Sequence, residues 1–126
     1  MSDEQDVLDV FDALYETACI QRDAAGALAL FVDDDLFFHG SGPNELARDR
    51  DGLRAILDRI AGHAVNLRFS WDTRAVHVVG DVAWITAVGH VAMDDTEAPY
   101  RTTGVFLRRA GVWRWQTHAG SVPVED

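Results

Sequence analysis

The segment VWRWQTH, residues 112–118, decides the fold of this chain. It is rich in aromatic and β-branched residues, so it predicts a β-strand. Successive side chains of a strand point to opposite faces of its sheet, which puts Trp113 and Trp115 together on one face. The other face then carries the polar side chains Arg114, Gln116 and His118. Both faces of the predicted sheet therefore need a partner.

Three upstream segments are likewise rich in β-branched and aromatic residues and are separated by short connections. The predicted strands cover residues 67–79, 82–93, 100–109 and 112–122. The connections between them are rich in Gly, Asp and Pro and are short enough for hairpins. The four segments therefore predict an antiparallel meander.

The first half of the chain instead shows apolar residues at spacings of three and four, which predicts amphipathic helices. The expected elements are helices over residues 3–22, 23–31 and 49–63, and a short strand over 35–39 before an exposed, Gly-rich loop. Asp23 is a candidate N-cap of the second helix. We expect one domain over residues 1–126 with an α+β fold, in which three N-terminal helices pack on a curved antiparallel sheet to form a cone.

The composition of the chain limits the classes of partner that it is expected to bind. The formal net charge is −10 over 126 residues, which disfavours nucleic acid and anionic membranes, because both are bound through Lys and Arg. The acidic N-terminus lacks the pattern of a secretory signal, and no apolar run reaches membrane-spanning length. The expected location is the cytoplasm. The single Cys19 falls on an apolar helical face and is interpreted as core packing.

Two stretches resemble the nuclear transport factor 2-like superfamily, in particular its SnoaL-like bacterial branch. They are AAGALALFVDD at residues 24–34 and GVWRWQTH at 111–118, the latter followed by SVP at 121–123. The C-terminal stretch is also similar to the association domain of calcium/calmodulin-dependent kinase II. The resemblance implies a cone-shaped, cystatin-like fold with a pocket, commonly in a dimer. It does not imply one chemistry, because the superfamily includes enzymes and noncatalytic binding domains.

Polar groups on otherwise apolar elements are the candidates for a site inside the cone. The proposed proton carriers are His118 on the last strand and His39 at the end of the first. The candidate ligand-binding residues are Tyr15, Trp84, Thr86 and Gln116. For each of these residues, structural packing or simple exposure is the competing interpretation.

The function stays open between two readings. One is an isomerase, cyclase or dehydratase that uses histidine-assisted proton transfer, and the other is a noncatalytic ligand-binding or assembly module. The five histidines are dispersed and no phosphate-binding motif occurs, so neither a metal nor a cofactor is expected. The expected partners are a small-molecule ligand and a second copy of the chain. Trp113 and Trp115 are the predicted interface aromatics, with the pocket as their alternative place.

Overall fold

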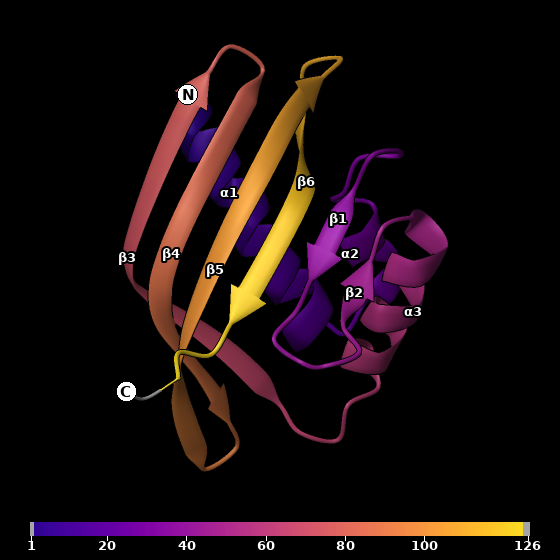
Figure 1. Ribbon diagram of the computed structural model, residues 1–126, viewed down its shortest axis with the longest axis vertical. Coiled ribbons are helices and arrows are strands. Elements are labelled where there is room, and N and C mark those ends of the chain that lie inside the picture. The colour runs from indigo at the N-terminus through magenta and orange to yellow at the C-terminus, as the bar shows by residue number, and fades with distance from the viewer. Residues whose placement is uncertain (1, 125–126) are drawn as a thin grey trace.

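A curved six-stranded sheet with few helices forms the α+β fold of the computed structural model, which describes residues 2–124. The strand order is β2-β1-β6-β5-β4-β3, and α1 lies across one face of the long strands (Figure 1). The long strands are β3 (Leu67–Val79), β4 (Val82–Met93), β5 (Thr96–Arg109) and β6 (Val112–Ser121). They pair antiparallel in chain order, so the predicted meander is confirmed.

Two short strands extend the meander at β6 and make the sheet mixed. The first, β1 (Phe37–His39), runs parallel to β6, with Phe38 opposite His118. The second, β2 (Leu46–Ala47), pairs antiparallel with β1. Strand β2 follows the Gly-rich loop and was absent from the sequence prediction, because two residues are too few to show an alternating pattern.

The helices differ from the prediction in length and placement. The first begins as α1 (Asp3–Tyr15) but continues as a π-helical turn, η1 (Glu16–Ile20). The second, α2 (Ala24–Leu28), is a short piece capped by Asp23 as predicted, and α3 (Arg50–Ala61) follows the two short strands. The arrangement of three helices before the sheet is therefore only partly correct. No helix within residues 2–124 is long and apolar enough to cross a membrane.

An extra residue in β6 brings side chains that were predicted on opposite faces onto the same face. Opposite β5, Phe106 pairs with Trp115 and the next pair is Val105 with Thr117, so Gln116 is a bulge. A bulge shifts the alternation by one residue, which turns both Trp115 and His118 toward the helices. Trp113 and Trp115 are 6% and 0% exposed. Their predicted place in an interface between subunits is therefore wrong.

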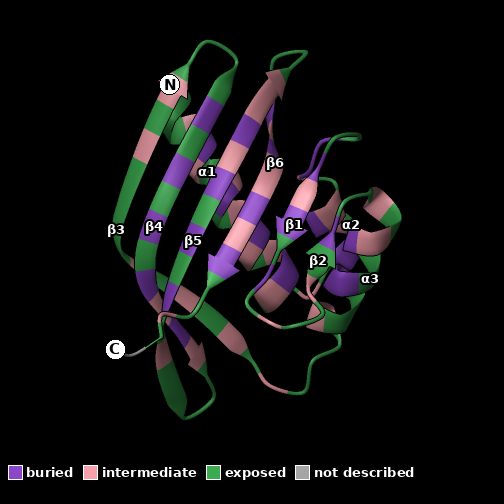
Figure 2. Ribbon diagram, viewed as in Figure 1, coloured by how far each residue is buried: buried purple, intermediate pink, exposed green. Residues whose placement is uncertain are grey.

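Strand β4 shows the same division between faces without a bulge of its own. Its inward residues are Ala83, Ile85, Ala87, Gly89 and Val91, all buried. Trp84 and Thr86 share a face as predicted, but that face points away from the helices, as the alternating bands of Figure 2 show. The expectation that these two side chains line the cone is therefore wrong.

The apolar core fills the space between α1 and the long strands of the sheet. Its centre is Trp115, whose ring packs against Phe11, Phe31 and Phe106 with ring centroids 5.4, 5.9 and 4.4 Å away. The indole Nε1 donates a hydrogen bond to the carbonyl of Val10, so burying its polar atom leaves no donor unpaired. This packing fixes the helix against the sheet and sets the wall of the cavity described next.

Candidate binding pocket

A cavity of about 560 Å³ lies next to this core. It is enclosed by the end of α1, η1 and α3 on one side and by the sheet on the other. Most of its wall is apolar, which is typical of a small-molecule site. The apolar lining includes Leu14, Ala18, Phe38, Ile56, Leu57, Ile60, Phe69, Val91 and Met93. The polar side chains of the wall include Tyr15 and His118, which touch each other.

Tyr15 and His118 form a hydrogen-bonded pair in this wall. Tyr15 Oη lies 3.0 Å from His118 Nε2 and 3.0 Å from Thr102 Oγ1. On the other side of the imidazole, Nδ1 lies 3.3 Å from the backbone carbonyl of His39. The four residues therefore form one chain of contacts that joins β5, α1, β6 and β1.

The contact with His39 assigns the tautomer of His118. A carbonyl oxygen can only accept, so Nδ1 must carry the proton and Nε2 of the neutral ring must be the acceptor. Tyr15 then donates its proton to Nε2. The contact between Tyr15 and Thr102 joins two hydroxyls, either of which can turn to donate. Because the single proton of Tyr15 goes to His118, Thr102 is the donor in this contact. The buried polar atoms of this chain are thereby all paired, in agreement with the absence of unsatisfied buried side-chain atoms within residues 2–124.

Both partners are neutral at pH 7, and burial moves the pKa of each further from that pH. Removal of the His118 ring from water lowers its pKa to about 4, an effect that outweighs the hydrogen bond to His39. Burial also raises the pKa of the Tyr15 hydroxyl well above its ordinary value. At neutral pH the pair is therefore an uncharged hydrogen-bonding unit, in a site where an uncompensated charge would be costly.

Local features of three elements place this pair. Tyr15 is the last residue of α1 before the π-helical turn, which also supplies Ala18 and Cys19 to the wall. His118 points inward only because of the bulge at Gln116. Its ring also stacks on Phe38 of the parallel neighbour β1, with centroids 4.5 Å apart and planes 8° from parallel. The imidazole is therefore held on both of its edges and on one face.

The mouth of the cavity is formed by residues 40–45 and the end of α3. Glu45 accepts a hydrogen bond from the backbone N–H of Gly42 at 2.6 Å, and Arg59 donates to the carbonyl of Asn44 at 2.9 Å. Tyr100 lies nearby in the wall, where burial raises its pKa to about 12. The charged side chains of the lining are thus confined to a partly exposed rim, and the interior is neutral.

The residues singled out from the sequence separate into two groups. Tyr15 and His118 meet in the cavity wall, whereas Trp84 and Thr86 lie on the opposite face of the sheet. Gln116 also faces outward and donates to the carbonyl of Asp35. The inward position expected for Gln116 is therefore wrong, because it is itself the bulged residue.

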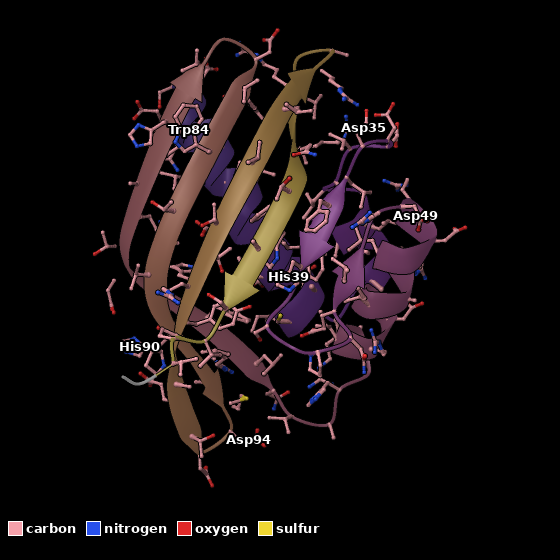
Figure 3. All side chains as sticks on the ribbon, in the orientation of Figure 1. Asp35, His39, Asp49, Trp84, His90 and Asp94 are labelled. Atoms are coloured by element: carbon pink, nitrogen blue, oxygen red, sulfur yellow. The ribbon has the colours of Figure 1, made fainter. Side chains whose placement is uncertain are left out.

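His39 contributes through its backbone and not through its ring. The side chain is exposed at the end of β1, where Figure 3 shows it on a different part of the sheet from Trp84. Its carbonyl oxygen is the group that meets His118. Within residues 2–124, no three His, Cys, Asp or Glu side chains are grouped to hold a metal ion.

Thr102 is the residue of this site that sequence reasoning missed. It is 1% exposed and is one of two buried polar side chains among the described residues, the other being His118. A signal was present, because Tyr100, Thr102, Gly104 and Phe106 alternate along one predicted strand. A polar residue between aromatic ones on an inward face is a candidate for a buried hydrogen bond.

Similarities to known proteins agree with this architecture. A family model described as a SnoaL-like domain matches residues 7–125. Among solved structures, a protein of Streptomyces avermitilis described as a proposed dehydratase of the NTF2-like family superposes with a TM-score of 0.86 at 18% identity, covering 98% of this chain and 97% of that one. These values show a common fold and leave the chemistry of this chain open.

A second structure links the fold to assembly domains. A proposed calcium/calmodulin-dependent kinase II association domain of Xanthomonas campestris superposes with a TM-score of 0.85 at 18% identity, covering 100% of this chain and 91% of that one. An NTF2-like protein of unknown function from Pseudomonas putida gives 0.84 at the same identity, with 97% and 87% covered. No protein of curated function matches. Because the family model covers nearly the whole sequence, the chain belongs to the SnoaL-like domain family.

Proposed function

We propose that the protein binds a small, largely apolar molecule in the cavity between the helices and the sheet. The observation that carries this proposal is the neutral Tyr15–His118 pair in the wall of an apolar space of about 560 Å³. Such a space is large enough for a molecule of two or more rings, and a few polar groups in an apolar wall fix a ligand's orientation. Binding is the function that the geometry supports best.

Catalysis by this pair is the second candidate. The similarity to a proposed dehydratase and the direct contact between Tyr15 and His118 favour an isomerase, cyclase or dehydratase with histidine-assisted proton transfer. Against it, His118 already accepts the proton of Tyr15, and a pKa of about 4 makes it a weak base at neutral pH. A noncatalytic pocket therefore agrees better with this geometry.

Filling the cavity is expected to abolish ligand binding. Val91 faces the cavity from β4, so Val91→Trp places an indole where the ligand would lie. We expect the affinity for a neutral apolar dye, N-phenyl-1-naphthylamine, to fall by at least about tenfold, as measured by the rise in dye fluorescence during titration. A parent protein that shows no saturable rise would contradict the proposal.

The same strand offers a matched control for this experiment. Val88 points to the opposite face and is 52% exposed, so Val88→Trp adds the same volume outside the cavity. It should leave dye affinity within about twofold of the parent. Ala18→Phe fills the cavity from the helix side and gives a second blocking variant, so the conclusion does not depend on the folding of one protein.

We also propose a homodimer through the outer face of the sheet, with residues other than those expected from the sequence. Val82, Trp84 and Val88 of β4 are apolar and between 38% and 52% exposed on that face. Exposed apolar side chains clustered on one face are typical of an interface. The proposal moves the contact from Trp113 and Trp115 to Trp84.

A charge within this group of apolar side chains is expected to separate the subunits. Trp84→Glu should convert a dimer into a monomer in size-exclusion chromatography with light scattering, because a carboxylate in a closed apolar interface lacks a partner. Leu46→Glu is the control, since Leu46 is 52% exposed on β2 at the far edge of the sheet. A parent protein that stays monomeric at micromolar concentrations would overturn the dimer.

A further inference from the structure

In the chain of contacts from Thr102 through Tyr15 and His118 to His39, each group donates to the next one. His118 uses its only proton on the carbonyl of His39, so its Nε2 must accept from Tyr15. The Tyr15 hydroxyl donates its only proton to His118, so in its hydrogen bond with Thr102 it is the acceptor. A phenolic oxygen has two acceptor sites, and Thr102 occupies one of them. What Tyr15 can still offer to a ligand is therefore an acceptor and not a donor.

The interior of the cavity also lacks a fixed positive charge. Its inner polar side chains, Tyr15, Tyr100 and His118, are all neutral at pH 7, because a tyrosine hydroxyl ordinarily keeps its proton at this pH and burial lowers the pKa of His118 to about 4. The fully charged side chains of the lining, Glu45 and Arg59, belong to the rim. A carboxylate or phosphate brought to the Tyr15–His118 pair would lose its water without gaining a counter-charge, which is unfavourable.

We infer that the ligand is a neutral ring compound that presents a hydroxyl or N–H group to the oxygen of Tyr15. The inference deepens the proposed binding function and rests on it. A ketone or ether oxygen placed at the same point would face the free lone pair of Tyr15. It could be accepted only if the Tyr15–His118 hydrogen bond first broke, and the imidazole nitrogen would then be left buried and unpaired.

Three naphthalene derivatives of similar shape test this inference. They are 2-naphthol, 2-methoxynaphthalene and 2-naphthoate, each titrated at pH 7 against the full-length protein by displacement of the bound dye. We expect 2-naphthol to bind about tenfold more tightly than its methyl ether, which lacks the donor. We expect the anionic 2-naphthoate to bind more weakly than either neutral compound.

Two variants locate the contact. Tyr15→Phe alone would free the Nε2 atom of His118 as a new acceptor, so it is combined with His118→Leu. In this double variant the preference for 2-naphthol over its ether should fall from about tenfold to about onefold, because both acceptors are gone. Tyr100→Phe removes the other tyrosine hydroxyl of the wall and should keep the preference. If Tyr100→Phe removes the preference and the double variant does not, the assigned contact is wrong.

Different binding results would contradict the inferred ligand class and the proposed ligand-binding function. Equal affinities for the alcohol and the ether, or preferred binding of the carboxylate, would overturn the inference about the ligand. Either result would still agree with ligand binding in the cavity. If neither the dye nor any of the three compounds binds, the proposed function fails, and the inference fails with it.

Discussion

Replacing Trp115 with alanine is expected to lower the free energy of unfolding by about 3–5 kcal/mol, which is the usual cost of deleting a large aromatic side chain from a core. The indole is fully buried and is surrounded by Phe11, Phe31 and Phe106. Its loss leaves a cavity and also removes the hydrogen bond from the indole to the carbonyl of Val10. Urea denaturation followed by circular dichroism measures the change.

The same substitution on the outer face is the control. Trp84 is 38% exposed, so Trp84→Ala should cost less than about 1 kcal/mol. Denaturation at two protein concentrations separates any contribution from self-association, which changes the midpoint with concentration. A Trp84→Ala variant as unstable as Trp115→Ala at both concentrations would mean that the faces of β4 and β6 are assigned incorrectly.

Acidification is expected to destabilise the fold through His118. The pKa of this imidazole falls from about 6.5 in the unfolded chain to about 4 when it is buried, so between these values the unfolded state binds the additional proton. Stability must therefore decrease as the pH falls. By linkage, the contribution of His118 to the free energy of unfolding should decrease by about 2 kcal/mol between pH 7 and pH 5.

Comparison with His118→Gln isolates this contribution from the many carboxylates of the chain. The parent should lose more stability than the variant on acidification, so the difference between their unfolding free energies should shrink as the pH falls. His77→Gln alters an exposed imidazole on β3 and should follow the parent curve. Parallel curves for the parent and His118→Gln would contradict the buried, neutral state of His118.

The long strands could be predicted because their pattern is local. Strands β3 and β4 begin and end at the predicted residues, since turn-forming pairs such as Gly80-Asp81 separate runs of β-branched and aromatic residues. The π-helical turn and β2 could not be predicted in the same way. Neither has a sequence pattern of its own, because the π-helical turn packs on α3 and β3 and the two residues of β2 form a strand only by pairing with β1.

The site was only partly predictable, and the reason is the bulge in β6. Tyr15 could be placed from helical spacing, and it does line the cavity. The inward place of His118 was found, but on the assumption that Gln116 accompanied it and that Trp115 faced the other way. One inserted residue exchanges the faces beyond it, and nothing in the segment WRWQTH shows which residue is extra.

The role of His39 shows a second limit. Its imidazole was the expected functional group, whereas its carbonyl oxygen is the atom that contacts His118. Backbone groups are present at every residue and leave no signal in the sequence. The parallel pairing of β1 with β6 places that carbonyl, and such pairing over three residues depends on the whole fold.

The most direct test of the ligand pocket is an NMR titration of the uniformly ¹⁵N-labelled protein with 2-naphthol at pH 7. We expect saturable shifts of the His118 ring nitrogens and of amides around the cavity, such as those of Ala18 and Val91, with little change at Trp84 on the outer face. Saturable shifts confined to the outer face, or no shift at His118, would contradict the proposed ligand pocket.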